Sequence, residues 1–113
     1  NISSIAGTRG VARFGAYCAS KFAVRGLTQV LAKELGEYGI QVNAICPGGF
    51  MTEPNVRWSQ EHPDVIEAFK ANIPSGDFGQ PEDLGPLAVY LASDASRYMT
   101  GAALVIDGGY TLW

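Results

Sequence analysis

The chain has 113 residues, with 8 Lys and Arg residues against 11 Asp and Glu residues and a formal net charge of −3. A chain of this length fits roughly one domain, and an apolar share of 47% with 17% charged residues allows a buried core. The negative net charge argues against a nucleic-acid or anionic-membrane partner, because both need a basic surface. No stretch reaches the ~18–20 consecutive apolar residues of a membrane span, so we expect no membrane association.

The first part of the chain predicts a strand followed by a long helix. Ile2 to Ala6 is short and apolar, which suits the end of a strand that runs into the loop Thr8–Gly15. A helix is predicted from Ala16, because apolar residues recur there at steps of three and four; these are Val24, Leu27, Leu31 and Leu35. Gly36 and Gly39 supply stop signals, and Gly39 is the better candidate for a left-handed residue that ends the helix.

A second strand is predicted at Ile40 to Ile45, and it ends at Pro47-Gly48-Gly49. Strand, helix and strand in this order favour a parallel sheet with a right-handed crossover. Residues 53–79 are more polar and fit only two short helices, Asn55–His62 and Pro63–Asn72. A segment beyond the carboxyl end of a strand is where a substrate lid would lie, although a solvated surface excursion explains the composition equally well. We refer to residues 53–79 as the lid segment.

The last part of the chain predicts one more helix and one more strand. Pro81-Glu82-Asp83 places a proline and two acids in the first turn of a helix that ends around Ser93. Ala102 to Ile106 is a final strand, and Asp107-Gly108-Gly109 closes it. The predicted order is therefore β-α-β, the lid segment, α and β, and the fold class is α/β with a parallel sheet.

Tyr17 and Lys21 carry the strongest chemical signal. They are four residues apart on the first predicted helix, so their side chains share one face. An ammonium group held close to a phenol favours the phenolate, which a tyrosine needs to act as a general acid or base. Ser4 lies at the end of the preceding strand, where its hydroxyl could meet the phenol over one substrate oxygen. The pair by itself also fits an ordinary surface contact between helix neighbours.

The turn after the second strand is a candidate ligand-binding loop. Pro47-Gly48-Gly49 leaves the sheet at a carboxyl edge, where open α/β sheets bind their ligands. Glycine lets backbone N–H groups approach a ligand, and the Thr52 hydroxyl could donate to a carboxamide or phosphate oxygen. An ordinary turn between a strand and a loop is the competing interpretation.

Several motifs occur together along the chain: Ser4, Tyr17-Cys18-Ala19-Ser20-Lys21, Val42-Asn43-Ala44-Ile45-Cys46-Pro47-Gly48, Gly79-Gln80-Pro81-Glu82-Asp83, Thr100-Gly101 and Asp107-Gly108-Gly109. In this order they resemble the short-chain dehydrogenase/reductase family. The likeness spans all 113 residues but covers only the C-terminal portion of a family member of about 250 residues. It implies the C-terminal part of one doubly wound parallel-sheet (Rossmann-like) domain. Since the chain opens on Asn1 rather than on Met, we expect it to be part of a longer protein.

The resemblance also implies roles for individual residues. Ser4 would orient the substrate oxygen, Tyr17 would be the acid or base, and Lys21 would favour the phenolate and hold the nicotinamide ribose. Tyr17 and Lys21 would thus contact both substrate and cofactor. The loop Pro47–Thr52 would hold the nicotinamide of NAD or NADP, with Pro47 and Gly48 shaping the turn, Phe50 acting through its backbone and Thr52 through its hydroxyl. One departure is visible, because many members carry Arg where this chain has Asp77.

The function that follows is NAD(P)-dependent interconversion of an alcohol and a ketone by hydride transfer, with Tyr17 moving the proton. The C-terminal residues 105–113 are similar to members that act on sugar alcohols and ketoses, so the expected partner is a small-molecule substrate. A non-catalytic fragment or interaction module and a nucleotide-sugar epimerase are the alternatives. Apolar residues on several sides of the first helix, together with Tyr110, Leu112 and Trp113, predict a homodimer or homotetramer.

Two cysteines, Cys18 and Cys46, are too few for a disulfide scaffold or a four-ligand zinc site. They are typical of buried thiols in a reducing compartment. We therefore expect a cytoplasmic protein without a bound metal.

Overall fold

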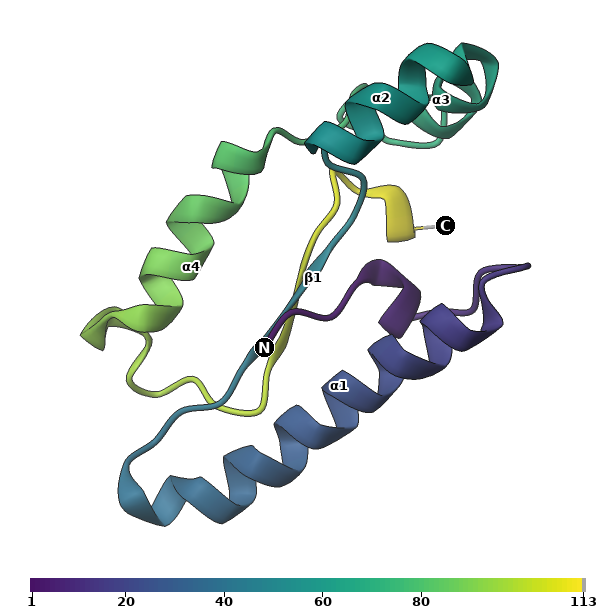
Figure 1. Ribbon diagram of the computed structural model, residues 1–113. Helices are drawn as coiled ribbons and strands as arrows, with labels where there is room; N and C mark the ends of the chain where they lie inside the picture. The colour runs from purple at the N-terminus through teal and green to yellow at the C-terminus, as the bar shows by residue number, and fades with distance from the viewer. Residues whose placement is uncertain (113) are drawn as a thin grey trace.

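A computed structural model describes residues 1–112 of the chain. Its helices and strands are α1 (Gly15–Leu35), β1 (Ala44–Pro47), α2 (Glu53–Glu61), α3 (Pro63–Lys70), α4 (Gly85–Ala92) and β2 (Ala103–Ile106). Short 3₁₀ turns are η1 (Ile5–Gly7), η2 (Gly36–Tyr38), η3 (Pro81–Leu84), η4 (Asp94–Ser96) and η5 (Tyr110–Leu112). The strands run between α1 and α4, while α2 and α3 lie together at one end (Figure 1).

The sheet is parallel, as predicted. β1 pairs with β2 in the register Ala44↔Ala103 to Pro47↔Ile106. On the other side of β1, Ile2 forms a parallel bridge with Ile45. Because helices flank these parallel strands, the α/β class predicted from the sequence is confirmed.

The first predicted strand is shorter than expected. Only the stretch around Ile2 pairs with β1, and the chain then turns into η1 instead of continuing as a strand to Ala6. The cause is Ser4, whose Oγ accepts a hydrogen bond from the backbone N–H of Ala6 at 3.1 Å. A serine side chain that satisfies a nearby backbone N–H competes with strand pairing and starts a turn.

The long helix begins one residue before the predicted start and ends as expected. α1 passes into η2, and Gly39 ends that turn in the left-handed conformation at φ 72°. The apolar stripe is only partly covered, since Leu31 and Leu35 are half-buried whereas Leu27 is exposed. The second strand is also shorter than predicted, because it begins at Ala44 rather than at Ile40.

The lid segment contains two short helices, as predicted, with boundaries at Glu53–Glu61 and Pro63–Lys70. It is more than a solvated excursion, because it contains a buried cluster of Ile66, Ile73 and Phe78. Met51, Phe69 and Tyr110 pack against this cluster. The lid segment therefore packs on the loop after β1 and on the turn after β2.

The helix predicted from Pro81 starts later than expected. Residues 81–84 form η3, and the α-helix proper starts at Gly85. The reason is Pro86, which has no N–H to donate and would clash with a preceding helical carbonyl, so an α-helix begins anew around it. No residue of α4 is buried, and no helix among residues 1–112 is long and apolar enough to cross a membrane.

Candidate functional site

The three segments expected to carry chemistry end at one edge of the sheet. Ile2 is opposite Ile45 and Pro47 is opposite Ile106. Parallel strands end at the same edge, so Ser4, the loop after Pro47 and the turn after Ile106 all begin there. This edge also faces the N-terminal half of α1, beside which η1 lies (Figure 1).

Tyr17 and Lys21 are neighbours on α1. The Lys21 Nζ lies 5.6 Å from the centroid of the Tyr17 ring, and it donates a hydrogen bond to the Ile2 carbonyl at 3.3 Å. Tyr17 is 46% exposed. The structure thus brings together the phenol and the ammonium that the i, i+4 spacing predicted on one helix face.

Ser4 is held at the start of η1, which packs against α1. Ser4 is 9% exposed, and its Oγ accepts a hydrogen bond from the Ala6 N–H. A hydroxyl that accepts one hydrogen bond still has its own proton to donate. Ser4 can therefore donate to an oxygen placed beside it.

The loop after β1 is packed tightly against the turn after β2. The Gly48 N–H donates to the Ile106 carbonyl at 2.9 Å, and a Cβ at Gly48 would stand 2.6 Å from the Asp107 Cβ. A Cβ at Gly49 would likewise collide with the Phe78 ring. Only glycine allows these close approaches, which explains why both residues follow Pro47.

Phe50 and Thr52 lie differently within this loop. Phe50 is buried, and its carbonyl accepts from the Asn55 side chain at 2.7 Å and from the Thr52 N–H at 2.9 Å. Thr52 is exposed and precedes α2 without using its side chain to cap that helix. The Thr52 hydroxyl is thus placed at the start of α2 without a capping role.

Asp107 fixes the turn after β2. Its carboxylate accepts from the Gly109 N–H at 2.9 Å and from the Thr111 N–H at 2.8 Å. Burial by itself raises the pKa of the Asp107 carboxyl, but these hydrogen bonds, one from the Thr111 side chain and the charge of Arg9 outweigh it and hold the pKa below its usual value. Asp107 is therefore a structural carboxylate that remains ionised at neutral pH.

An aromatic stack joins the lid segment to this turn. The Tyr110 ring stacks on Phe69 with centroids 4.4 Å apart, and Phe69 stacks on Phe78 at 5.2 Å. The Arg9 guanidinium lies 4.9 Å from the Tyr110 ring centroid. Sequence reasoning missed this stack, because its members are far apart in the chain and no periodicity relates them.

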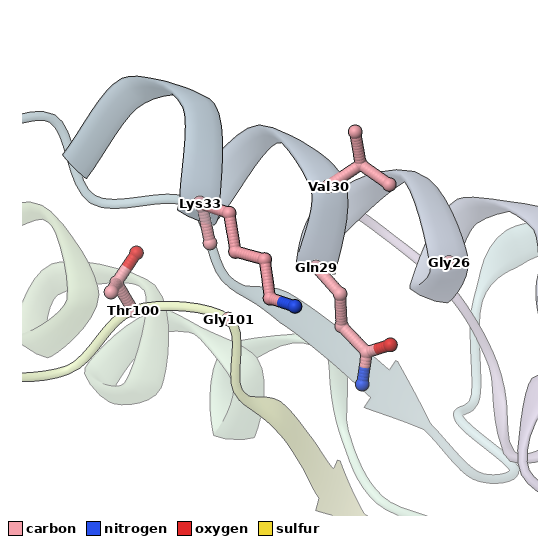
Figure 2. A pocket seen from close by; sticks show the side chains of 7 residues that line it. Gly26, Gln29, Val30, Lys33, Thr100 and Gly101 are labelled. Atoms are coloured by element: carbon pink, nitrogen blue, oxygen red, sulfur yellow. The ribbon is translucent and has the colours of Figure 1, made fainter.

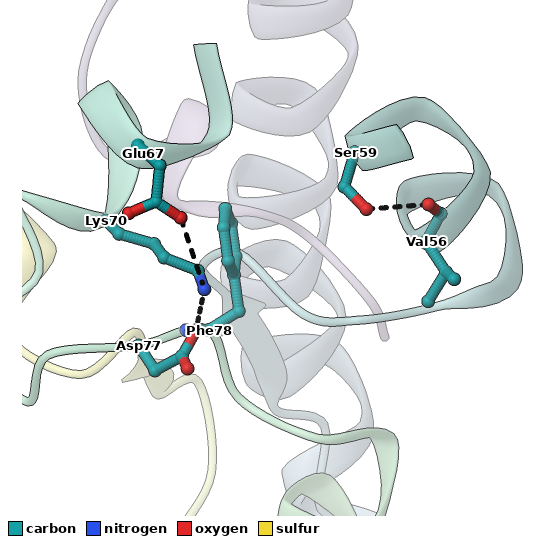
Figure 3. A network of polar contacts seen from close by, with 6 residues as sticks. All are labelled: Val56, Ser59, Glu67, Lys70, Asp77 and Phe78. Carbon is teal, nitrogen blue, oxygen red and sulfur yellow. Dashed lines mark hydrogen bonds and ion pairs between the residues drawn. The ribbon is translucent and has the colours of Figure 1, made fainter. Parts of the chain in front are cut away.

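Asp77 forms an ion pair with a lysine of the lid segment. The Lys70 Nζ lies 3.1 Å from the Asp77 carboxylate and 3.7 Å from that of Glu67 (Figure 3). The hydrogen bond from Lys70 and the backbone N–H of Phe78 hold the pKa of Asp77 below its usual value, while the Asp77 hydrogen bond raises the pKa of Lys70. The ion pair therefore ties α3 to the segment next to Gly79.

Two cavities differ in their relation to this edge. One of about 250 Å³ is lined by residues of the loop after β1 and of the turn after β2, including Gly49 and Asp107. A larger one of about 680 Å³ lies between the C-terminal half of α1 and Thr100-Gly101, with Gln29 and Lys33 extending over it (Figure 2). The larger cavity lies beside Thr100 and Gly101, before β2 begins, whereas the smaller one lies at the carboxyl edge where β1 and β2 end, so we take the smaller cavity as the candidate site. Among the described residues, Ser4, Tyr17 and Lys21 line neither cavity. Within residues 1–112, no three His, Cys, Asp or Glu side chains are grouped as metal ligands would be.

Known proteins are similar to this chain in sequence and in structure. A family model described as enoyl-(acyl carrier protein) reductase matches residues 1–111. The chain is 44% identical over 113 residues to an NAD-dependent glycerol dehydrogenase of Listeria innocua. The aligned region covers 99% of this chain and 43% of that protein. It is 45% identical to a D-threitol dehydrogenase of Mycolicibacterium smegmatis, over 99% of this chain and 42% of that protein.

Solved structures agree with these sequence matches. A 4-hydroxyisoleucine dehydrogenase complexed with NADH superposes with a TM-score of 0.90 at 36% identity, over 100% of this chain and 46% of that one. A short-chain type dehydrogenase/reductase from Mycobacterium marinum superposes with a TM-score of 0.86 at 40% identity, over 97% of this chain and 42% of that one. The chain spans less than half the length of these relatives. The match over nearly its whole length shows that the chain belongs to the short-chain dehydrogenase/reductase family.

Proposed function

We propose that the protein carrying this chain is an NAD- or NADP-dependent oxidoreductase that interconverts an alcohol and a ketone. The observation that carries the proposal is the placement of Tyr17 and Lys21 side by side on α1, next to the turn that begins with Ser4. A phenol, an ammonium and a hydroxyl at one sheet edge suit proton transfer to or from a substrate oxygen.

Each of these residues has a distinct task in the proposed reaction. Tyr17 takes the hydroxyl proton of the alcohol during oxidation and returns a proton to the carbonyl oxygen during reduction. Ser4 donates a hydrogen bond to the same oxygen and orients it. Lys21 carries a positive charge beside the ring and favours the phenolate form. A nicotinamide cofactor held by Lys21 and the loop Pro47–Thr52 would supply the hydride chemistry of the reaction.

The loop Pro47–Thr52 fits the nicotinamide end of such a cofactor. The backbone of Gly48 and Gly49 is fixed against Asp107 and Phe78, and the Phe50 carbonyl is already engaged, which leaves its backbone N–H as the group to offer. The Thr52 hydroxyl is exposed and takes no part in capping α2. With Lys21 on the ribose, these residues would hold half of the cofactor, and the remainder of the domain would hold the other half.

A polyol or ketose substrate is favoured by the relatives, which include the glycerol and D-threitol dehydrogenases. Both forms of the cofactor occur among them, since a candidate 2-deoxy-D-gluconate 3-dehydrogenase from Agrobacterium tumefaciens has bound NADP and the 4-hydroxyisoleucine dehydrogenase has NADH. We propose that the alcohol is a small polyol and that the cofactor is NAD or NADP.

A cytoplasmic homodimer or homotetramer is part of the same proposal. Cys18 and Cys46 are free thiols, which suits a reducing compartment. Leu27 and Val30 of α1 and Val89 of α4 are large apolar residues that stay exposed, as at a protein interface. Trp113, which was also expected at this interface, lies outside the described residues. Light scattering should give at least twice the monomer mass, and a monomer would contradict the proposed assembly.

The function is tested with a panel of polyols and ketoses assayed with NAD and with NADP. The protein is used at full length, and also as a chimera in which this chain replaces the segment it matches in the Listeria innocua glycerol dehydrogenase. We expect a substrate-dependent change in nicotinamide absorbance in both. Binding of the cofactor without turnover of any alcohol or ketone would instead favour a non-catalytic interaction module.

A further inference from the structure

η1 is fastened to α1 by contacts that do not themselves involve the reacting groups. The Ser3 Oγ donates to the Lys21 carbonyl at 2.8 Å. On the next turn of α1, Arg25 Nη1 donates to the Gly7 carbonyl at 2.7 Å. These bonds grip the residues before and after Ser4 and attach them to the helix that carries Tyr17.

Gly7 brings the two elements into direct backbone contact. A Cβ at this position would stand 2.6 Å from the Lys21 carbonyl oxygen and would also meet the Ser3 Oγ. Any larger residue must therefore push η1 away from α1. The φ of Gly7 is not in the left-handed region, so the close approach is what requires glycine here.

Arg25 continues the face of α1 on which Tyr17 and Lys21 lie, since the three residues are spaced by four. Its side chain is half-buried, and its Nε is buried without a hydrogen-bond partner among residues 1–112. A guanidinium placed there has given up hydration, and its bond to Gly7 is the contact it makes across the two elements.

We infer that Ser3, Gly7 and Arg25 are positioning residues that fix the Ser4 hydroxyl relative to the Tyr17 hydroxyl. This inference rests on the proposed function. Two hydroxyls that share one substrate oxygen must keep a fixed separation, and the crossing bonds set it by fixing η1 on α1. Displacement of a reacting group by 1 Å can cost ~10²-fold in rate.

The test compares Arg25→Met and Ser3→Ala with the wild type in the full-length protein. We expect kcat to fall by about tenfold or more, while the dissociation constant of the cofactor changes by less than about twofold. Arg25→Lys keeps a cationic donor and should recover at least about half of the lost kcat. Gly7→Ala should have the lowest kcat of these variants. If Gly7→Ala does not fold, Arg25→Met and Ser3→Ala still test the positioning role.

Matched controls remove the same groups elsewhere. Ser93→Ala deletes a serine that follows α4 and donates to the Tyr90 carbonyl of that helix at 2.8 Å, and Arg97→Met deletes an exposed cation. Both should keep the wild-type kcat. Hydrogen exchange of the Ser4–Gly7 amides should rise in Arg25→Met and Ser3→Ala and not in the controls.

Three results would overturn the inference. The first is faster exchange at Ser4–Gly7 with an unchanged kcat, and the second is a loss of cofactor affinity as large as the loss of kcat. The third is an Arg25→Lys enzyme as slow as Arg25→Met. Tyr17→Phe separates these results from a failure of the proposed function: if it abolishes turnover while the Ser3 and Arg25 variants stay fast, only the positioning role is wrong.

Discussion

Tyr17 is the residue on which the proposed chemistry depends. Tyr17→Phe removes the hydroxyl and keeps the ring, so folding and the edge contact with Phe14 at 6.4 Å should persist. General acid–base catalysis contributes ~10²–10⁴-fold, and kcat of the full-length enzyme should fall by at least about two orders of magnitude. Steady-state kinetics with saturating cofactor measures this, and cofactor binding should change much less.

Tyr38→Phe is the matched control for that substitution. Tyr38 is 69% exposed in the turn after α1, so loss of its hydroxyl should leave kcat at the wild-type value. If Tyr17 and Lys21 formed only a surface contact between helix neighbours, worth a few tenths of a kcal/mol, Tyr17→Phe would behave like this control. Retention of more than about half of the wild-type kcat, with chemistry rate-limiting, would exclude Tyr17 as the acid or base.

Asp107 should contribute to stability in a pH-dependent way. Its folded pKa is lowered, so its contribution is fully present above the unfolded pKa of ~3.9 and is lost as pH falls through the folded value. Asp107→Asn replaces one carboxylate oxygen by an NH2 group, which cannot accept a hydrogen bond, and in the full-length protein it should cost roughly 1 kcal/mol at neutral pH. Urea unfolding at pH 7 and near pH 3 measures the difference, which should shrink at the lower pH. A difference that stays constant would show that the charge of Asp107 is unimportant.

At the scale of elements, α3 is held to the segment before Gly79 by the ion pair of Lys70 with Asp77. Exchanging the partners in a Lys70→Asp, Asp77→Lys double variant should restore the attachment that either single variant weakens. Hydrogen exchange of the α3 amides in the full-length protein reads this directly. Both side chains are solvent-accessible, so added salt should reduce the difference between the wild type and the single variants.

The pH dependence of this pair has two limits. The folded pKa of Asp77 is lowered, so its contribution disappears as pH falls through that value, and the folded pKa of Lys70 is raised, so its contribution is lost as pH rises through that value. The protection of the α3 amides in the wild type, measured relative to intrinsic exchange at each pH, should therefore be greatest between these limits. Glu67 also forms an ion pair with Lys70. A variant that removes only the charge of Asp77, Asp77→Asn, therefore loses only one of the two ion pairs of Lys70. Single and double variants with equal exchange would contradict this attachment of α3 by the Lys70–Asp77 ion pair.

The elements that the sequence predicted best are those with local signals. The 3.6-residue pattern predicted α1, and a left-handed glycine, Gly39, ends the 3₁₀ turn that follows it. The four-residue spacing of Tyr17 and Lys21 predicted that their side chains lie together. The turn at η1 was not predicted, because its cause is one serine side chain that competes with the sheet. The stack of Phe69, Phe78 and Tyr110 was not predicted either, since it depends on contacts between residues distant in sequence.

At the scale of the whole molecule, the chain is extended for its length. Its radius of gyration is 15.4 Å, with principal extents of 50 × 28 × 25 Å, whereas a compact domain of this size would have about 13 Å. No residue of α4 is buried, and large apolar side chains of α1 and α4 are exposed. A two-stranded parallel sheet is rarely stable alone, because parallel sheets need cover on both faces.

Residues 1–113 expressed alone should therefore aggregate or remain partly folded, and should show no turnover. The same residues in the chimera with the glycerol dehydrogenase relative gain the rest of the sheet, so we expect that protein to unfold cooperatively in urea. Light scattering and dye binding to exposed apolar surface measure the state of the isolated chain, with the chimera as the control. A monomeric chain that binds no dye and unfolds in one cooperative transition would show that the contacts of α1 with η1 and β1 suffice for folding. The exposed apolar faces would then be explained by an interface with other subunits rather than by the remainder of the domain.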